Sequence, residues 1–190
     1  MAADNLEAFI GRCRGVMAAE GESADIVHRI APFMRALLLD RREFVNPEHF
    51  RSDPASYARN AVYVSDDGSL SLFVLVWLPG QWTPVHDHGS WGVVGVLSGV
   101  LEEHNYMSVD GEIRSDRGIR LKRGGGTFLP AGAVTTFVPN PDHIHVTGVP
   151  EDRALAVSLH LYGRNMHSFH IYDVALGSRR LVDVPHYRSR

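Results

Sequence analysis

The sequence predicts a mainly β protein, a barrel or sandwich of short strands with an N-terminal helical segment packed on it. From about residue 61 onward, short β-branched and aromatic runs alternate with turn signals at roughly ten-residue spacing, which is typical of such folds. Residues 1–55 instead carry apolar side chains at three- and four-residue steps, the period of a helix that buries one face. No low-complexity linker separates the two parts, so we expect a single domain over residues 1–190.

Two helices are expected within residues 1–55. The first has one apolar stripe, formed by Leu6, Phe9, Ile10, Cys13, Val16 and Met17. The second should begin at Ser23, a residue suited to the N-cap, and run towards Leu39, with Pro32 kinking or splitting it. Because Cys13 falls on the apolar stripe, we interpret it as a buried packing residue rather than a nucleophile.

The barrel itself is expected over residues 56–175. The strongest strand character lies in five segments, residues 91–97, 99–107, 134–138, 144–147 and 154–162. The remaining stretch, residues 176–190, is polar and basic. We expect it to be a solvated or oligomer-contacting tail rather than an arm that binds nucleic acid.

Composition and charge exclude several classes of protein. With 19 Lys and Arg against 22 Asp and Glu, the chain has no broad basic field, so we expect no nucleic-acid partner. The longest apolar run, residues 72–78, is too short to span a bilayer, and no apolar signal core is seen, so we expect no membrane partner and a cytoplasmic location. A single cysteine excludes an internal disulfide and a cysteine-based zinc cluster.

The chain has 11 histidines, and several of them lie two residues apart. His86 and His88 are the most informative pair. On a strand, residues two apart share a face, and two imidazoles on one face can bind a borderline divalent metal. The alternative is a pair of surface histidines with Asp87 between them. His143 and His145 form a second pair with the same spacing.

The residues around the first pair resemble the first motif of the cupins. The motif positions are occupied by Gly80, His86, His88 and Gly99, while Gly92 stands where the motif has its glutamate. The second cupin motif is partly visible in Gly124, Pro130 and Gly132. The resemblance implies a cupin barrel, that is, a double-stranded β-helix or jelly roll, which has lost its carboxylate ligand.

Two further stretches carry polar residues that are candidates for a functional site. Ser158, His160 and Tyr162 alternate with leucines, so they share one strand face and could hydrogen-bond in series. A half-buried strand with a wet outer face would give the same alternation. Upstream, Tyr57 and Arg59 lie just before the first expected strand, where a lone arginine is more often a surface residue.

Together these stretches resemble the thiol dioxygenases, the cysteine dioxygenase family of cupins. The resemblance implies an Fe(2+) ion held by His86, His88 and His145. His145 is assigned as the third ligand, with His143 as its neighbour, because it lies 13 residues before Ser158 as in the family. The resemblance also implies that catalysis involves Ser158, His160 and Tyr162, and that the substrate carboxylate is held by Tyr57 and Arg59.

The implied reaction is the oxidation of a small carboxylated thiol by O2 to its sulfinic acid. Because Gly92 replaces the cysteine of crosslinked family members, Tyr162 should be unmodified. Tyr57 and Arg59 match the branch that converts L-cysteine to cysteine sulfinate, whereas the residues after Tyr162 resemble the 3-mercaptopropionate branch and make Arg164 a second candidate for the carboxylate. An alternative from another class is a non-catalytic metal-binding cupin that acts as a sensor. The oligomeric state is left open.

Overall fold

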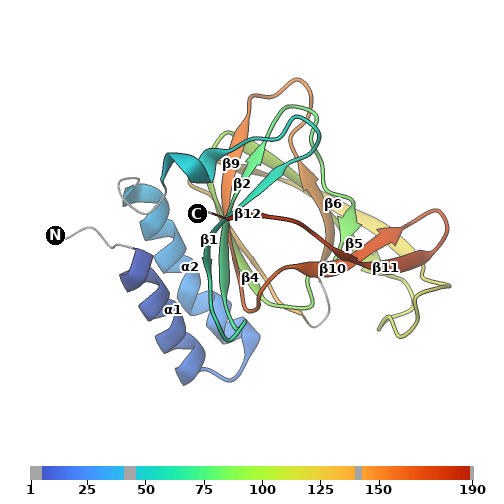
Figure 1. Ribbon diagram of the computed structural model, residues 1–190. Helices are drawn as coiled ribbons and strands as arrows, with labels where there is room; N and C mark the ends of the chain where they lie inside the picture. The colour runs from blue at the N-terminus through green and yellow to red at the C-terminus, as the bar shows by residue number, and fades with distance from the viewer. Residues whose placement is uncertain (1–5, 41–45, 140–142, 189–190) are drawn as a thin grey trace.

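The computed structural model describes residues 6–40, 46–139 and 143–188. Two six-stranded β-sheets face each other, and two N-terminal helices lie against the outside of one sheet (Figure 1). The predicted mainly β fold with N-terminal helices is therefore confirmed. None of the helices in the described part of the chain combines the length and apolar character that a membrane span requires.

The first sheet carries the strand that the sequence analysis marked as polar on one face. Its strands are, in order, β12 (Tyr187–Arg188), β1 (Ala58–Val64), β2 (Ser71–Trp77), β9 (Ala156–Tyr162), β4 (Gly92–Ser98) and β7 (Val134–Phe137). Strand β9 pairs antiparallel with both β2 and β4, and all seven of its residues are buried. The alternative of a wet outer face on this strand is therefore wrong.

The second sheet brings the two histidine pairs together. Its strands are, in order, β11 (Ser178–Asp183), β10 (Ser168–Asp173), β3 (Val85–His86), β8 (Ile144–Gly148), β5 (Val100–Ser108) and β6 (Leu121–Pro130). Strands β3 and β8 pair antiparallel, with His86 directly opposite His145. Apolar side chains from both sheets meet in one inner cluster, which includes Phe73, Leu75, Val94, Leu101, Leu129 and Phe169.

The helices cover the outer face of the first sheet. Helices α1 (Leu6–Ala19) and α2 (Ser23–Asp40) share a buried cluster with outward-facing residues of β2 and β9, and a short 3-10 helix follows at Pro47–Phe50. A Cβ added at Gly95 on β4 would lie 2.9 Å from side-chain atoms of Met34 and Leu38, so the glycine lets α2 approach the sheet. Cys13 is fully buried in this cluster, as expected.

Two sequence-based expectations differ from the structure, and one of the two effects expected of Pro32 does not occur. Helix α2 continues without interruption across Pro32, so the proline does not split the helix. Arg59 lies within β1 rather than before the first strand. The stretch predicted as a tail contains β11 and β12, although Arg190 lies outside the described residues. Strand β11 is an edge strand with no fully buried side chain, so it lacks the apolar alternation that would have revealed it.

Candidate metal centre

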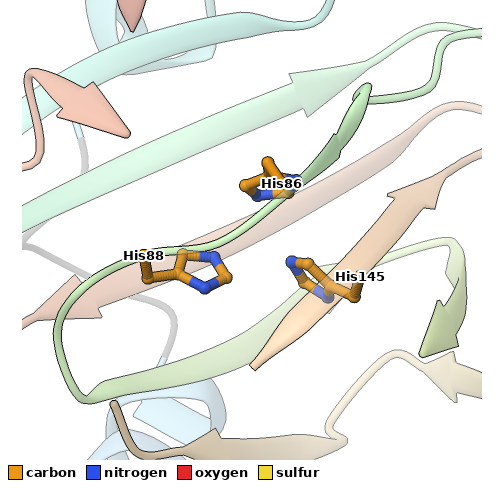
Figure 2. Close-up of side chains that lie close together, drawn as sticks. All are labelled: His86, His88 and His145. Carbon is orange, nitrogen blue, oxygen red and sulfur yellow. The ribbon is translucent and has the colours of Figure 1, made fainter. Parts of the chain in front are cut away.

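Three imidazoles meet inside the barrel. His86 ends β3, His88 follows two residues later, and His145 projects from the neighbouring β8 towards both of them (Figure 2). Their exposed fractions are 6%, 3% and 4%, and their candidate ligand nitrogens all lie within 4.8 Å of one another. The structure thus brings the three predicted ligands together in a buried cluster.

Hydrogen bonds fix the orientation of two of these rings. The Nδ1 of His86 lies 3.0 Å from the carbonyl oxygen of Pro84, and the Nδ1 of His145 lies 2.8 Å from Oε2 of Glu103. A carbonyl or carboxylate oxygen only accepts, so each Nδ1 is the donor and each Nε2 carries a free lone pair. This is the arrangement in which protein imidazoles usually bind metals.

The unpaired nitrogens of the cluster provide a test of whether a metal fits. His145 Nε2 and His88 Nδ1 are buried and lack a hydrogen-bond partner within the described part of the chain. Leaving a buried polar atom unpaired costs free energy, so such atoms call for an explanation. A divalent cation between the three rings would supply it. Nitrogen ligands suit iron as well as zinc and copper, so the residues present fit Fe(2+).

The electrostatics of the cluster favour neutral rings. Burial lowers the pKa of His86 and of His88 well below the ordinary value, and in each case the other histidines of the cluster lower it further. Burial also lowers the pKa of His145, although Glu103 opposes this. Neutral imidazoles are the form that binds metals, so the three rings are already in the metal-binding protonation state at neutral pH.

A carboxylate behind His145 is the main feature that sequence reasoning missed. Burial raises the pKa of Glu103, but hydrogen bonds to His143 and His145 outweigh it, so the net pKa is lowered and the group is a carboxylate. The signal was present in the sequence, because Glu103 alternates with Leu101 and shares its strand face. A charged residue at an inward-facing strand position indicates a partner inside the barrel.

The three polar residues of β9 form a hydrogen-bonded chain. Ser158 Oγ lies 2.8 Å from Nε2 of His160, and Nδ1 of His160 lies 3.1 Å from the Tyr162 hydroxyl. Trp77, which the sequence analysis did not single out, donates its indole N–H to Ser158 Oγ over 2.9 Å. If Ser158 donates to His160 and His160 donates to Tyr162, every donor behind the tyrosine is satisfied. The tyrosine proton is then left for a group in the cavity.

Arg59 lies on the wall of the same cavity. It is 6% exposed, its guanidinium carbon lies 4.8 Å above the ring of Phe73, and its Nη2 donates to the backbone carbonyl of Met166. Its Nη1 is buried and has no hydrogen-bond partner within the described residues. Burial lowers the pKa of Arg59, while Tyr162 and Tyr57 oppose this. A buried cation with an unused donor favours an anionic partner.

The cavity collects most of the predicted site residues. Its lining includes Tyr57, Arg59, His86, His88, His145, His160 and Tyr162, together with the apolar side chains of Leu75, Val94, Phe137, Met166 and Phe169. Tyr57 is held by stacking on Trp77, with ring centroids 4.6 Å apart. Ser158 is fully buried behind His160.

Arg164 lies elsewhere. Its Nε donates to the backbone carbonyl of His88 over 3.0 Å, and its Nη2 donates to the backbone carbonyl of Ser168. It does not line the cavity. The structure therefore gives this arginine a place in supporting the loop that carries His88, behind the wall of the site.

A two-sheet barrel with three converging buried histidines is the architecture of a cupin with a candidate metal site. The chain belongs to the cysteine dioxygenase type I family, because the model of that family matches residues 19–175. Membership of this family supports an oxidoreductase with a metal centre.

Solved structures with a similar fold share little sequence identity with this chain. A protein with a double-stranded beta-helix domain from Klebsiella pneumoniae subsp. pneumoniae is 20% identical, with 70% of this chain and 97% of that chain covered and a TM-score of 0.48. A Cupin 2 conserved barrel domain protein from Salinispora arenicola is 15% identical, with 67% and 84% covered and a TM-score of 0.41. A recombinant oxalate oxidase is 17% identical, with 60% and 54% covered and a TM-score of 0.42. The family assignment does not rest on these likenesses.

Proposed function

We propose that this protein is an Fe(2+)-dependent dioxygenase that oxidises a small carboxylated thiol with O2 to the sulfinic acid. L-Cysteine is the first candidate substrate, and 3-mercaptopropionate is the second. The observation that carries the proposal is the shared cavity: three buried imidazoles line it together with the buried guanidinium of Arg59. Within the described residues, two of those imidazoles and the guanidinium each have a buried nitrogen without a hydrogen-bond partner, so a metal and an anion are both called for in one cavity.

His86, His88 and His145 would hold the metal. Ferrous iron bound there would lower the pKa of the substrate thiol and make O2 reactive. Because all three ligands are neutral, none of the groups bound directly to the cation would offset its charge, and an anionic thiolate is favoured as the next partner. A carboxylate ligand, as in the common two-histidine triad, would weaken that preference.

Arg59 would bind the carboxylate of the substrate. Its Nη1 has no hydrogen-bond partner within the described residues, while Nη2 donates to the Met166 carbonyl and the Phe73 ring lies against the guanidinium. A charge-assisted hydrogen bond in a buried cavity is both strong and directional. We place the clamp on Arg59 rather than Arg164, since the latter already donates to two backbone carbonyls.

Tyr162 would donate its hydroxyl proton to a reacting group in the cavity. Burial raises the pKa of Tyr162, so the hydroxyl stays protonated at neutral pH. Burial also lowers the pKa of His160 to about 3, so this ring stays neutral and orients the tyrosine through its Nδ1. Ser158 and Trp77 fix the other side of the imidazole.

The reaction balances without a further reductant. Converting a thiolate to a sulfinate removes four electrons, and O2 accepts four when both of its atoms enter the product. The apolar side chains of Leu75, Met166 and Phe169 on the cavity wall would limit access of water while this happens.

Oxygen consumption by the Fe(2+)-loaded protein tests the proposal. L-Cysteine, 3-mercaptopropionate and cysteamine are offered separately, and the product is analysed by mass spectrometry for a gain of two oxygen atoms. We expect uptake with the two acids and little with cysteamine, which has no carboxylate for Arg59. A zinc-loaded sample is the control and should consume no oxygen. If no thiol supports uptake while iron stays bound, the protein is a metal-binding module instead.

A further inference from the structure

We infer that Glu103 is a positioning residue of the metal centre, which holds His145 in place and supplies from behind it the negative charge that the ligand set lacks. The inference rests on the metal site of the proposed function, but it does not depend on which thiol is the substrate. Glu103 lies on β5, the strand that pairs with β8 on the side away from β3.

The burial of Glu103 indicates that its carboxylate has a specific structural role. The residue is 7% exposed, and a buried carboxylate is costly unless charged or hydrogen-bonding partners compensate it. Its Oε2 accepts from Nδ1 of His145 at 2.8 Å, and its Oε1 lies 3.5 Å from Nε2 of His143. Both imidazoles compensate the carboxylate, and the shorter of the two contacts is with His145, the residue that faces the cavity.

The hydrogen bond acts on the metal through the ring. By accepting from Nδ1, the carboxylate fixes the tautomer of His145, turns its Nε2 lone pair towards the other two histidines and makes that nitrogen more basic. Position 92, which carries a glutamate in the usual cupin motif, is a glycine here. The carboxylate of this site therefore lies one imidazole further from the metal position.

The neighbouring residue offers a matched control. Glu102 also accepts from an imidazole, that of His104, with Oε1 2.7 Å from Nε2. Successive residues on a strand point to opposite faces, so this pair lies on the other side of β5 from the metal site. Glu102→Gln removes a carboxylate–histidine contact of nearly the same length and leaves the metal centre untouched.

Cobalt binding to metal-free protein tests the inference without relying on turnover. The native protein, Glu103→Gln and Glu102→Gln are titrated with Co(2+) against a competing chelator, and the visible spectrum of the bound ion is recorded. We expect Glu103→Gln to weaken affinity by about 10- to 100-fold and to shift the cobalt bands. Glu102→Gln should match the native protein in both respects. Circular dichroism of the metal-free variants shows that each is folded; Glu103→Asp replaces Glu103→Gln if the latter is not, with a smaller loss expected.

The possible results distinguish a failure of the proposed role of Glu103 from a failure of the metal site itself. If native protein binds cobalt but Glu103→Gln shows the same affinity and spectrum, the role of Glu103 is refuted and the metal site stands. If the native protein binds no cobalt, the metal site itself fails, and the inference fails with it. Glu103, His143 and His145 could also hold an ion by themselves. Two cobalt ions per native chain and one per Glu103→Gln chain would make Glu103 a ligand and overturn the positioning role.

Discussion

A Cβ built at Gly92 would lie 2.2 Å from Cζ of Phe137, well inside van der Waals contact. The phenyl ring thus fills the position from which the cupin glutamate would reach the metal. The same ring stacks on His88, with centroids 4.2 Å apart. Gly92 is therefore more than a lost ligand, because its lack of a side chain makes room for the aromatic ring that stacks on His88, a proposed metal ligand.

Gly92→Ala should destabilise the protein. The added methyl group would force the ring of Phe137 away from His88, and overpacking of this kind typically costs about 1–3 kcal/mol. The measurement is the free energy of unfolding of the metal-free protein in denaturant. Gly125→Ala is the control, since a Cβ there would meet no heavy atom within 4 Å. Equal stability of Gly92→Ala and the control would show that Phe137 can move aside freely.

His145→Ala should remove most of the bound iron, whereas His143→Ala should retain it. His145 presents to the other two histidines a buried Nε2 that has no hydrogen-bond partner in the described part of the chain. The Nε2 of His143 instead lies 3.2 Å from Nδ1 of His145, on the far side of that ring, and the side chain is 23% exposed. The iron content per chain after reconstitution and desalting is the measurement. The reverse result would mean that the third ligand has been assigned to the wrong histidine.

The sequence could predict several barrel strands, the helices and the three histidines that meet in the cavity, because each depends on local periodicity or on a motif. Strand β9 and the pair His86 and His88 are examples. It could not show that Trp77 donates to Ser158 or that Glu103 holds His145, because these contacts join residues 81 and 42 positions apart. Such contacts depend on which strands become neighbours, and one sequence does not encode that in a readable pattern.

The two arginines illustrate the same limit. The sequence offers Arg59 as the first candidate for the substrate carboxylate and Arg164 as the second, and the fold gives the two side chains different surroundings. Strand β1 carries Arg59 to the cavity wall, while the turn after β9 directs the guanidinium of Arg164 to backbone carbonyls. Sequence reasoning supplies the two candidates, and the tertiary structure shows which of them lines the cavity.

Arg59→Gln should lower kcat/KM for carboxylated thiols. Removing one partner of a buried charge pair costs roughly 2–5 kcal/mol, which corresponds to a loss of about 30-fold to several thousand-fold. The variant should have little effect on any residual turnover of cysteamine. Arg114→Gln, at a site where the side chain is 82% exposed, serves as the control. Efficient turnover of cysteamine by the native protein, together with an unaffected Arg59→Gln, would refute the carboxylate clamp.

No thioether crosslink should form in this protein. Gly92 pairs with Tyr162 across β4 and β9 but carries no sulfur, and the single cysteine, Cys13, lies on α1 with its side chain buried in the cluster that the helices share with the first sheet. Burial raises the pKa of Cys13 to about 12, so its thiol should be unreactive until the protein unfolds. The intact mass should equal the sequence mass, and the unfolded chain should titrate one thiol. Two electrophoretic bands that merge in Tyr162→Phe would contradict this.

His160 should make the native protein more sensitive to acid. Burial lowers its pKa from 6.5 to about 3, with His145 and Arg59 adding to the effect, so the folded state keeps the ring neutral. As the pH falls below 6.5, the unfolded chain takes up a proton at this position and the folded chain does not, so the free energy of unfolding decreases.

The variant His160→Gln removes that difference in proton uptake between the folded and unfolded chains. Between about pH 6 and pH 4, the native protein should therefore lose stability more steeply than the variant, by up to about 1.4 kcal/mol per pH unit. Urea unfolding of the metal-free proteins at several pH values measures this, with His28→Gln, at an exposed position of α2, expected to follow the native curve. Parallel curves for the native protein and His160→Gln would show that the ring is protonated, or that its charge is compensated, in the folded state.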